Sequence, residues 1–168
     1  RRSIINISLI GMPGAGKSTV GVVLAKQMGM QFIDTDILLQ VREQATLEQI
    51  IERQGYLALR AIERQIIQQL DVQNSVIATG GSAVYNDDAM QNLQRLGAII
   101  YLNVSPKQLS ERLGDFMQRG IAAAANASLE QLLEERIPLY EKYAQYTVDS
   151  ELCLIEEVAE KITQLRQK

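Results

Sequence analysis

The sequence of 168 residues contains no histidine, no tryptophan and a single cysteine. Without histidine there is no imidazole base and a structural zinc site is hard to assemble, so proton transfer would fall to carboxylates, lysine or tyrosine. Cys153 cannot form an internal disulfide, which is typical of a reducing compartment. Its apolar setting, ELCLI, favours a buried small side chain over a nucleophile.

Long apolar runs and an excess of one charge are also missing. No run approaches the ~20 residues that a membrane-spanning helix needs, and no stretch reads as a secretory leader. The 17 basic and 20 acidic residues are interspersed and leave a net charge of −3. The sequence therefore lacks the basic cluster that is typical of proteins that bind nucleic acid or an anionic membrane. We therefore expect a cytoplasmic protein without nucleic-acid or membrane partners, and we expect a monomer.

The chain does contain an alternation of short apolar segments and helical patterns. With 46% apolar residues it can build one core, so we expect residues 1–168 to form a single domain. Strands that are apolar throughout and alternate with helices predict a parallel sheet between two helical layers, a three-layer α/β/α fold of about five strands. The expected strands are IINISLI, QFIDTD, SVIATGG, AIIYLNV and a weak one near Thr147–Val148.

Capping signals divide the segments between these strands into helices. One apolar stripe follows the first strand and ends at Gly29. Residues 37–70 read as helix in pieces, with Thr46 as an N-cap and Gly55 as a break. Further helices are expected in DDAMQNLQRLG, in SPKQLSERLG with Ser105 as N-cap, from Ser128 to about Tyr146, and from about Ile155.

The segment GMPGAGKS, residues 11–18, matches the phosphate-loop pattern GxxxxGK[ST], and it follows a strand and opens a helix as that loop must. Glycines let successive backbone N–H groups approach phosphate oxygens, and the helix start adds its positive dipole end. Lys17 would neutralise the β/γ-phosphates during catalysis, and the Ser18 hydroxyl would bind Mg²⁺. The alternative is a glycine-rich turn without a ligand. The residues expected to bind ATP here are Gly14, Ala15, Gly16, Lys17, Ser18 and Thr19.

Two aspartates follow the second strand, in FIDTDIL, whereas the later strands end without an acid. Residues two apart on a strand point to the same side, so Asp34 and Asp36 should face one place, with Thr35 turned away. We assign Asp34 to the water shell of the metal ion and Asp36 to the acceptor hydroxyl, as orienting group and candidate general base. The alternative is that Asp36 only caps the next helix. An acid at this strand indicates a small-molecule kinase rather than a motor or GTPase.

Further motifs follow in a characteristic order. They are Arg60 with Glu63 in LRAIE, ATGG at residues 78–81, Arg112 and Arg119, and RIPLY at residues 136–140. Together with GMPGAGKST and DTD, they make nearly the whole chain resemble shikimate kinases, a branch of the nucleoside-monophosphate-kinase-like P-loop fold. The resemblance implies an ATP:shikimate 3-phosphotransferase of chorismate biosynthesis that uses Mg²⁺.

The resemblance also implies a substrate site, with a helical substrate-binding region at about residues 37–72. Arg60 and Arg136 would bind the carboxylate of shikimate through guanidinium forks. Asp36 would bind the region of the reacting hydroxyl, and the backbone at Gly80 and Gly81 would approach the ring closely. The alternatives are that Arg60 is a solvated helix residue paired with Glu63, and that Arg136 is a surface charge.

A lid over the nucleotide is implied at about residues 115–126. Arg112 and Arg119 would bind ATP, and Arg119 would bring a cation to the transferring phosphoryl group while the lid excludes water. The alternative is that Ala122–Ala125 merely extend the following helix.

Four positions depart from the family pattern. Gly120 replaces the lid proline, Ser82 the third glycine of GGG, Tyr56 a glutamate and Leu59 a phenylalanine. None of these four positions lies in the phosphate loop, so we expect them to affect the identity of the acceptor and the turnover rather than ATP binding. There are therefore two alternative functions. One is a kinase for another small hydroxyl compound, and the other is an ATP-binding regulatory pseudo-kinase.

Overall fold

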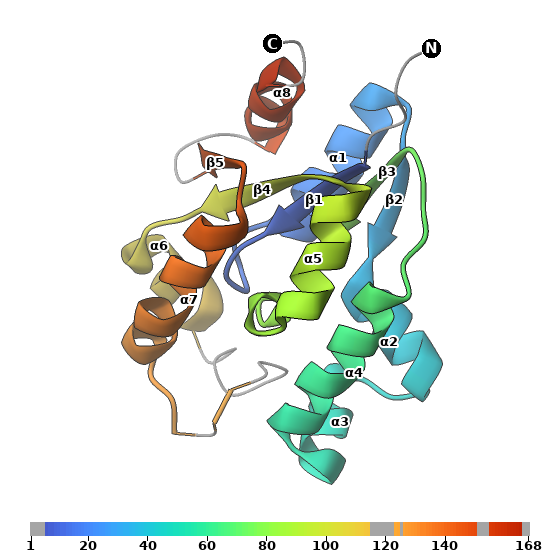
Figure 1. Ribbon diagram of the computed structural model, residues 1–168. Coiled ribbons are helices and arrows are strands. Elements are labelled where there is room, and N and C mark those ends of the chain that lie inside the picture. Colours follow the sequence, from blue (N-terminus) through green and yellow to red (C-terminus); the bar gives the residue numbers. More distant parts are fainter. Residues whose placement is uncertain (1–5, 115–122, 125, 151–154, 166–168) are drawn as a thin grey trace.

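A computed structural model shows a five-stranded, wholly parallel sheet with helices on both faces (Figure 1). It describes residues 6–114, 123–124, 126–150 and 155–165. The predicted three-layer α/β fold is confirmed. In the spatial order β2-β3-β1-β4-β5, the strands are β2 (Gln31–Asp34), β3 (Ser75–Ala78), β1 (Asn6–Ile10), β4 (Gly97–Asn103) and β5 (Tyr146–Asp149).

Two helices, α1 and α8, pack side by side on one face of the sheet, while α5 and α7 cover the other (Figure 1). The remaining helices extend the molecule at the ends and edges of the sheet. The helices are α1 (Lys17–Met28), α2 (Thr35–Glu43), α3 (Leu47–Gln54), α4 (Tyr56–Gln68), α5 (Asp87–Leu96), α6 (Pro106–Leu113), α7 (Leu129–Tyr143) and α8 (Ile155–Leu165), with a short 3₁₀ turn, η1 (Ala83–Tyr85).

Most helix ends lie where the capping signals predicted them. Gly29 ends α1 with a φ of 65°, a left-handed value that suits glycine. Thr46 and Gln49 form a reciprocal capping box at the start of α3, which satisfies two backbone N–H groups. The helix that follows Ser128 ends at Tyr143 rather than near Tyr146, because strand β5 begins at Tyr146. The turn η1 was not predicted.

The main hydrophobic core lies around β1 and β3, whose residues are buried throughout. The edge strands β2 and β5 are partly exposed and β4 is buried only in its middle, so the expectation of strands buried throughout holds for β1 and β3. A buried asparagine, Asn6, joins the amino ends of three strands: its Nδ2 donates to the carbonyls of Val72 and Leu96, and its Oδ1 accepts the N–H of Ser75. Of the described helices, none is both long and apolar enough to cross a bilayer.

Helices α2, α3 and α4 form a separate group beside the β2 edge of the sheet (Figure 1). Leu39, Ile50 and Leu59 are its buried centre, and Tyr56 packs against them. This cluster is distinct from the main core. The three helices therefore carry their own small apolar interior.

Candidate active site

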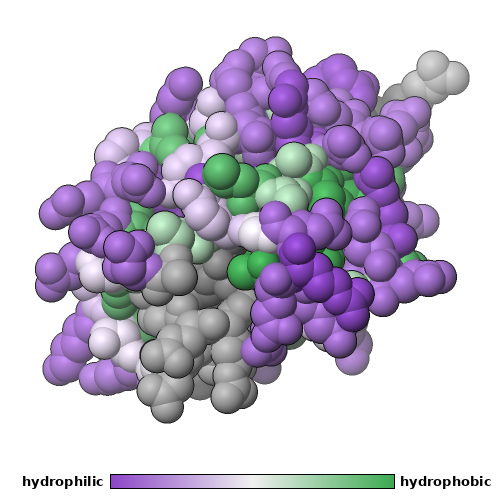
Figure 2. All heavy atoms as spheres, turned by 90° about the horizontal axis from the view of Figure 1, so that it is seen from below, coloured by the Kyte–Doolittle hydropathy of each residue, from purple (hydrophilic) through white to green (hydrophobic). Residues whose placement is uncertain are grey.

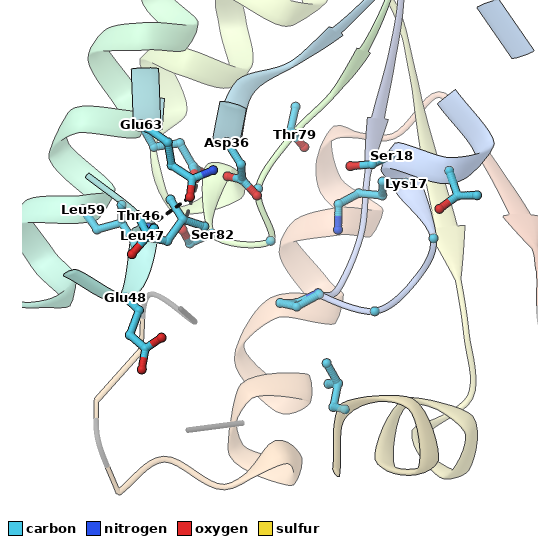
Figure 3. Close-up of a pocket in the computed structure, with 18 of the residues that line it drawn as sticks. Lys17, Ser18, Asp36, Thr46, Leu47, Glu48, Leu59, Glu63, Thr79 and Ser82 are labelled. Carbon is cyan, nitrogen blue, oxygen red and sulfur yellow. Dashed lines mark hydrogen bonds between the residues drawn. The ribbon is translucent and has the colours of Figure 1, made fainter. Parts of the chain in front are cut away.

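A cavity of about 720 Å³ opens at the carboxyl ends of the strands. The phosphate loop after β1 forms one wall, α2 and α4 form another, and the turn after β3 closes the side between them (Figure 3). In a view onto the corresponding end of the molecule, hydrophilic residues surround a central area that contains hydrophobic and weakly polar ones (Figure 2). Such a setting at the strand ends is where α/β proteins bind ligands.

The phosphate loop has the expected conformation. Gly14 and Gly16 take φ values of 80° and 92°, which other residues rarely adopt. The buried Lys17 points into the cavity, and its Nζ donates to the carbonyls of Gly11 and Met12 at 2.7 and 2.8 Å. Burial lowers the pKa of Lys17 to about 8, against the opposing effect of Asp36. Lys17 is thus a buried cation at the bottom of an open site.

The other residues expected to bind ATP divide into two groups. Gly14, Gly16, Ser18 and Thr19 line the cavity with Lys17. Ala15 instead lies buried under the loop. Its backbone N–H donates to the carbonyl of Met12 at 3.1 Å.

Asp34, rather than Asp36, caps α2. The strand ends at Asp34, whose Oδ1 accepts the N–H groups of Asp36 and Ile37 at 2.9 and 3.3 Å. The capping alternative for Asp36 is therefore wrong, and so is the strand geometry predicted for it, since Asp36 lies in the first helical turn. Thr35 is buried away from solvent. The two carboxylates are nevertheless close enough for Asp34 to raise the pKa of Asp36, although burial is the larger cause.

The second oxygen of Asp34 faces the phosphate loop. Ser18 Oγ donates to Asp34 Oδ2 at 2.6 Å, so a hydroxyl that lines the cavity lies beside a carboxylate. Such a pair fits Mg²⁺, which binds few protein oxygens and fills its shell with water and phosphate. Among the described residues there is no cluster of three or more His, Cys, Asp or Glu side chains that could hold a metal alone. The donor set fits a nucleotide-bound ion rather than a protein cage.

Asp36 and Glu63 face the cavity opposite Lys17 (Figure 3). Glu63 on α4 is only 3% exposed. Burial raises the pKa of Glu63 to about 8, and the nearby Asp36 adds to the shift. In the sequence, Glu63 stands out only as part of the LRAIE motif and as a candidate partner of Arg60. Its spacing did contain a signal, because Glu63 lies midway between Leu59 and Ile67 on the buried stripe of α4.

The backbone after β3 approaches these carboxylates closely. A Cβ on Gly80 would lie 2.8 Å from Asp36 Oδ1 and would also collide with Glu63. A Cβ on Gly81 would lie 2.6 Å from Pro13 Cδ in the phosphate loop. Ser82, which is buried, directs its Oγ to Glu63 Oε1 at 3.5 Å (Figure 3). A side chain at either position would therefore force neighbouring protein atoms to shift.

The two arginines expected to bind substrate lie in different environments. Arg136 on α7 is fully buried and lines the cavity with Asp36, so the alternative of a surface charge is wrong. Arg60 lines a second hollow of about 570 Å³. Its guanidinium carbon lies 3.9 Å from the centre of the Tyr85 ring and 5.0 Å from that of Tyr56. Burial lowers the pKa of Arg60, and Arg136 acts in the same direction.

Two tyrosines for which the sequence predicted no role complete this region, although Tyr140 ends the RIPLY motif. Tyr85 accepts a hydrogen bond from Arg136 Nε at 3.2 Å. Tyr140 donates to the Gly81 carbonyl at 2.6 Å and stacks on Tyr101. No spacing signal could have found Tyr85, because it lies in the turn η1 that the sequence did not predict.

The nucleotide side is described only in part. Arg112 lines the cavity, where its Nη1 donates to the Gly14 carbonyl at 3.0 Å and its Nη2 to Gln108 at 2.8 Å. Arg119 and most of the predicted lid, residues 115–122 and 125, lie outside the described residues. The predictions made for them are therefore unchanged.

Comparison with known proteins identifies relatives over almost the whole chain. The family model for shikimate kinase matches residues 13–166. A shikimate kinase from Thermodesulfovibrio yellowstonii is 37% identical over 160 residues, which cover 94% of this chain and 92% of the relative. The solved shikimate kinase of Acinetobacter baumannii in complex with shikimate has a TM-score of 0.90 and 32% identity, and covers 98% of this chain and 94% of its own. That of Bacteroides thetaiotaomicron has a TM-score of 0.83 and 28% identity, over 99% and 100% of the two chains.

Proposed function

The chain belongs to the shikimate kinase family, and from this premise we propose that it transfers the γ-phosphoryl group of ATP to the 3-hydroxyl of shikimate. The observation that carries the proposal is a single cavity in which Lys17 faces Asp36. The buried Arg136 lines the same cavity. A cation for phosphate, an acid for a hydroxyl and a cation for a carboxylate are what this reaction needs. The similarity to a shikimate-bound structure supports shikimate as the acceptor.

We propose that the phosphate loop holds ATP through Gly14, Ala15, Gly16, Lys17, Ser18 and Thr19. When ATP binds, Lys17 would give up its hydrogen bonds to the carbonyls of the loop and bind the β- and γ-phosphates instead. Ser18 would ligate Mg²⁺ directly, and Asp34 would hold it through a water molecule. When bound, Mg²⁺ neutralises phosphate charge.

On the acceptor side, Asp36 would orient the hydroxyl. The hydroxyl oxygen forms a bond to the γ-phosphorus, the bond from that phosphorus to the β,γ-bridging oxygen breaks, and ADP leaves. Asp36 takes the hydroxyl proton. Its raised pKa makes it a better proton acceptor than an ordinary aspartate would be.

Arg60 and Arg136 would bind the carboxylate of the acceptor, and the backbone of Gly80 and Gly81 would lie against its ring. Arg112 and Arg119 would contact ATP, the latter from the proposed lid at about residues 115–126. The helical region at about residues 37–72 would supply the acceptor-binding wall. These roles follow family positions and, for the described residues, agree with which side chains reach the cavity or its neighbour.

Measuring ADP production with a panel of acceptors tests the function. The panel contains shikimate, other hydroxy acids, sugar acids and nucleoside monophosphates, each with ATP and Mg²⁺. Shikimate-dependent ADP release supports the proposal. Turnover with another acceptor only would select a different small-molecule kinase, for which Leu59 and Ser82 in the cavity wall are the candidates that alter recognition. ATP binding without acceptor-dependent turnover would select a regulatory pseudo-kinase.

A further inference from the structure

Tyr85 contacts both arginines of the proposed anion site through its ring, with the guanidinium carbon of Arg136 5.3 Å from the ring centre, and it contacts Arg136 through its hydroxyl as well. Its ring face lies 3.9 Å from the guanidinium carbon of Arg60. Its hydroxyl accepts from Arg136 Nε at 3.2 Å and donates to Glu135 Oε2 at 2.8 Å. One side chain therefore links a residue of α4 to two residues of α7.

This arrangement answers an electrostatic difficulty. Two guanidinium groups that serve one anion must lie near each other, and they repel each other until the anion binds. The face of an aromatic ring carries negative potential, and a phenolic oxygen accepts hydrogen bonds, so Tyr85 offers each cation a favourable contact. Tyr56, at 5.0 Å from Arg60, adds a second aromatic face.

The contacts with Tyr85 also orient the guanidinium groups of the two arginines. A guanidinium that stacks on a ring keeps its N–H groups in the plane, where they suit a carboxylate. Arg136 donates to Tyr85 through Nε, whereas its Nη1 lies 3.1 Å from the position that a Cβ on Gly81 would take. The outer end of Arg136 thus points to the cavity wall while its inner nitrogen is held.

Tyr85 is itself held in place by its surroundings. It ends η1, which packs against α4, α5 and α7, and its hydroxyl is oriented by Glu135, the neighbour of Arg136. Tyr85 does not line the cavity that contains Lys17 and Asp36 but borders the hollow beside it with Arg60. Its effect on the acceptor would therefore pass through the arginines.

We propose that Tyr85 is a positioning residue that fixes Arg60 and Arg136 in the relative orientation with which they bind the carboxylate of the acceptor. This inference rests on the proposed function. It predicts that Tyr85 matters for acceptor binding and not for ATP binding or for the proton transfer at Asp36.

The test compares Tyr85→Phe and Tyr85→Leu with the unaltered protein, by steady-state kinetics and by calorimetric binding of shikimate. We expect Tyr85→Leu to raise the KM for shikimate about tenfold, and Tyr85→Phe, which keeps the ring, about threefold. The KM for ATP and kcat should change less than about twofold. Tyr146→Leu, at an exposed tyrosine of β5, is the matched control and should change none of these constants.

The methyl ester of shikimate separates positioning from general damage, because it keeps the ring and hydroxyls but lacks the anion. Tyr85→Leu should weaken binding of the acid and leave the weaker binding of the ester nearly unchanged. Equal losses for both compounds, or an unchanged KM for shikimate, would overturn the proposal. If Tyr85→Leu lowers the melting temperature, Tyr85→Phe decides the question by the same acid-to-ester comparison.

Failure of the proposed function has a different signature. If the unaltered protein does not phosphorylate shikimate, the variants are compared with the acceptor that the panel identifies. A carboxylate acceptor whose KM rises in Tyr85→Leu supports the role of Tyr85, and an uncharged acceptor, or a KM that stays unchanged, removes it.

Discussion

Ser18 and Asp34 are joined by a hydrogen bond of 2.6 Å, although they are 16 positions apart in the chain. The bond connects the helix that follows the phosphate loop to the end of an edge strand. The same carboxylate caps α2 with its other oxygen. Asp34 thus combines a structural role with a proposed role beside the metal ion, and substitutions can separate the two.

Asp34→Ala should lower the free energy of unfolding by about 1–2 kcal/mol, since it removes a helix cap and the partner of Ser18. Asp34→Asn should retain most of that stability, because asparagine also caps helices, but should require more Mg²⁺ for half-maximal activity. Urea unfolding and a Mg²⁺ titration measure the two effects. An Asp34→Ala protein as stable as the unaltered one would disprove the capping role.

Asp36→Asn should fold with near-normal stability and lose about 10²-fold or more in kcat, the usual contribution of a general base. The pKa of Asp36 is raised mainly by burial, so its ionised form is costly and a neutral amide should not destabilise the site. Denaturant unfolding and steady-state kinetics give the two values. A kcat within about threefold of the original would exclude Asp36 as the base.

Gly80→Ala should impair activity strongly, because the new Cβ would collide with the carboxylates of Asp36 and Glu63. We expect kcat/KM for the acceptor to fall by more than about tenfold, through displacement of groups that must be held in place. Ser82→Ala in the same turn separates a collision from the loss of a contact, since it removes the oxygen directed to Glu63 and adds no atom. If both variants kept full activity, the close packing at Gly80 would have no role in function.

Glu63→Gln should change how stability depends on pH. The pKa of Glu63 is raised from 4.5 to about 8, so the folded state binds its proton more tightly than the unfolded chain does. The associated stability is present below pH 4.5 and is lost as the pH rises to about 8.

Relative to Glu63→Gln, the unaltered protein should therefore lose stability across this range, by up to about 1.4 kcal/mol per pH unit. Urea unfolding at a series of pH values measures the difference, with the exposed Glu52→Gln as control. A difference that is constant from pH 5 to pH 8 would show that Glu63 ionises normally.

Local patterns predicted the fold well. Apolar segments separated by capped helices gave the five strands, and Gly29 and Thr46 marked helix ends correctly because caps act through a few neighbouring residues. The DTD segment was interpreted less well. Strand periodicity was applied to Asp36, but the capping by Asp34 starts the helix two residues earlier than expected.

The long-range features of the site could not be predicted in the same way. The stacking of Arg60 on Tyr85 and the burial of Arg136 depend on how α4, η1 and α7 pack. Motif positions indicated both arginines but not their separation into two hollows. The monomeric state, the lid and the contacts of Arg119 stay predictions.

The separate interior of α2–α4 bears on how this enzyme could be altered. Because Leu39, Ile50 and Leu59 form a cluster distinct from the main core, their replacement should act on this group of helices rather than on the sheet or the phosphate loop. A library confined to these three helices is therefore the economical starting point for directed evolution toward a new acceptor, with the nucleotide half kept constant.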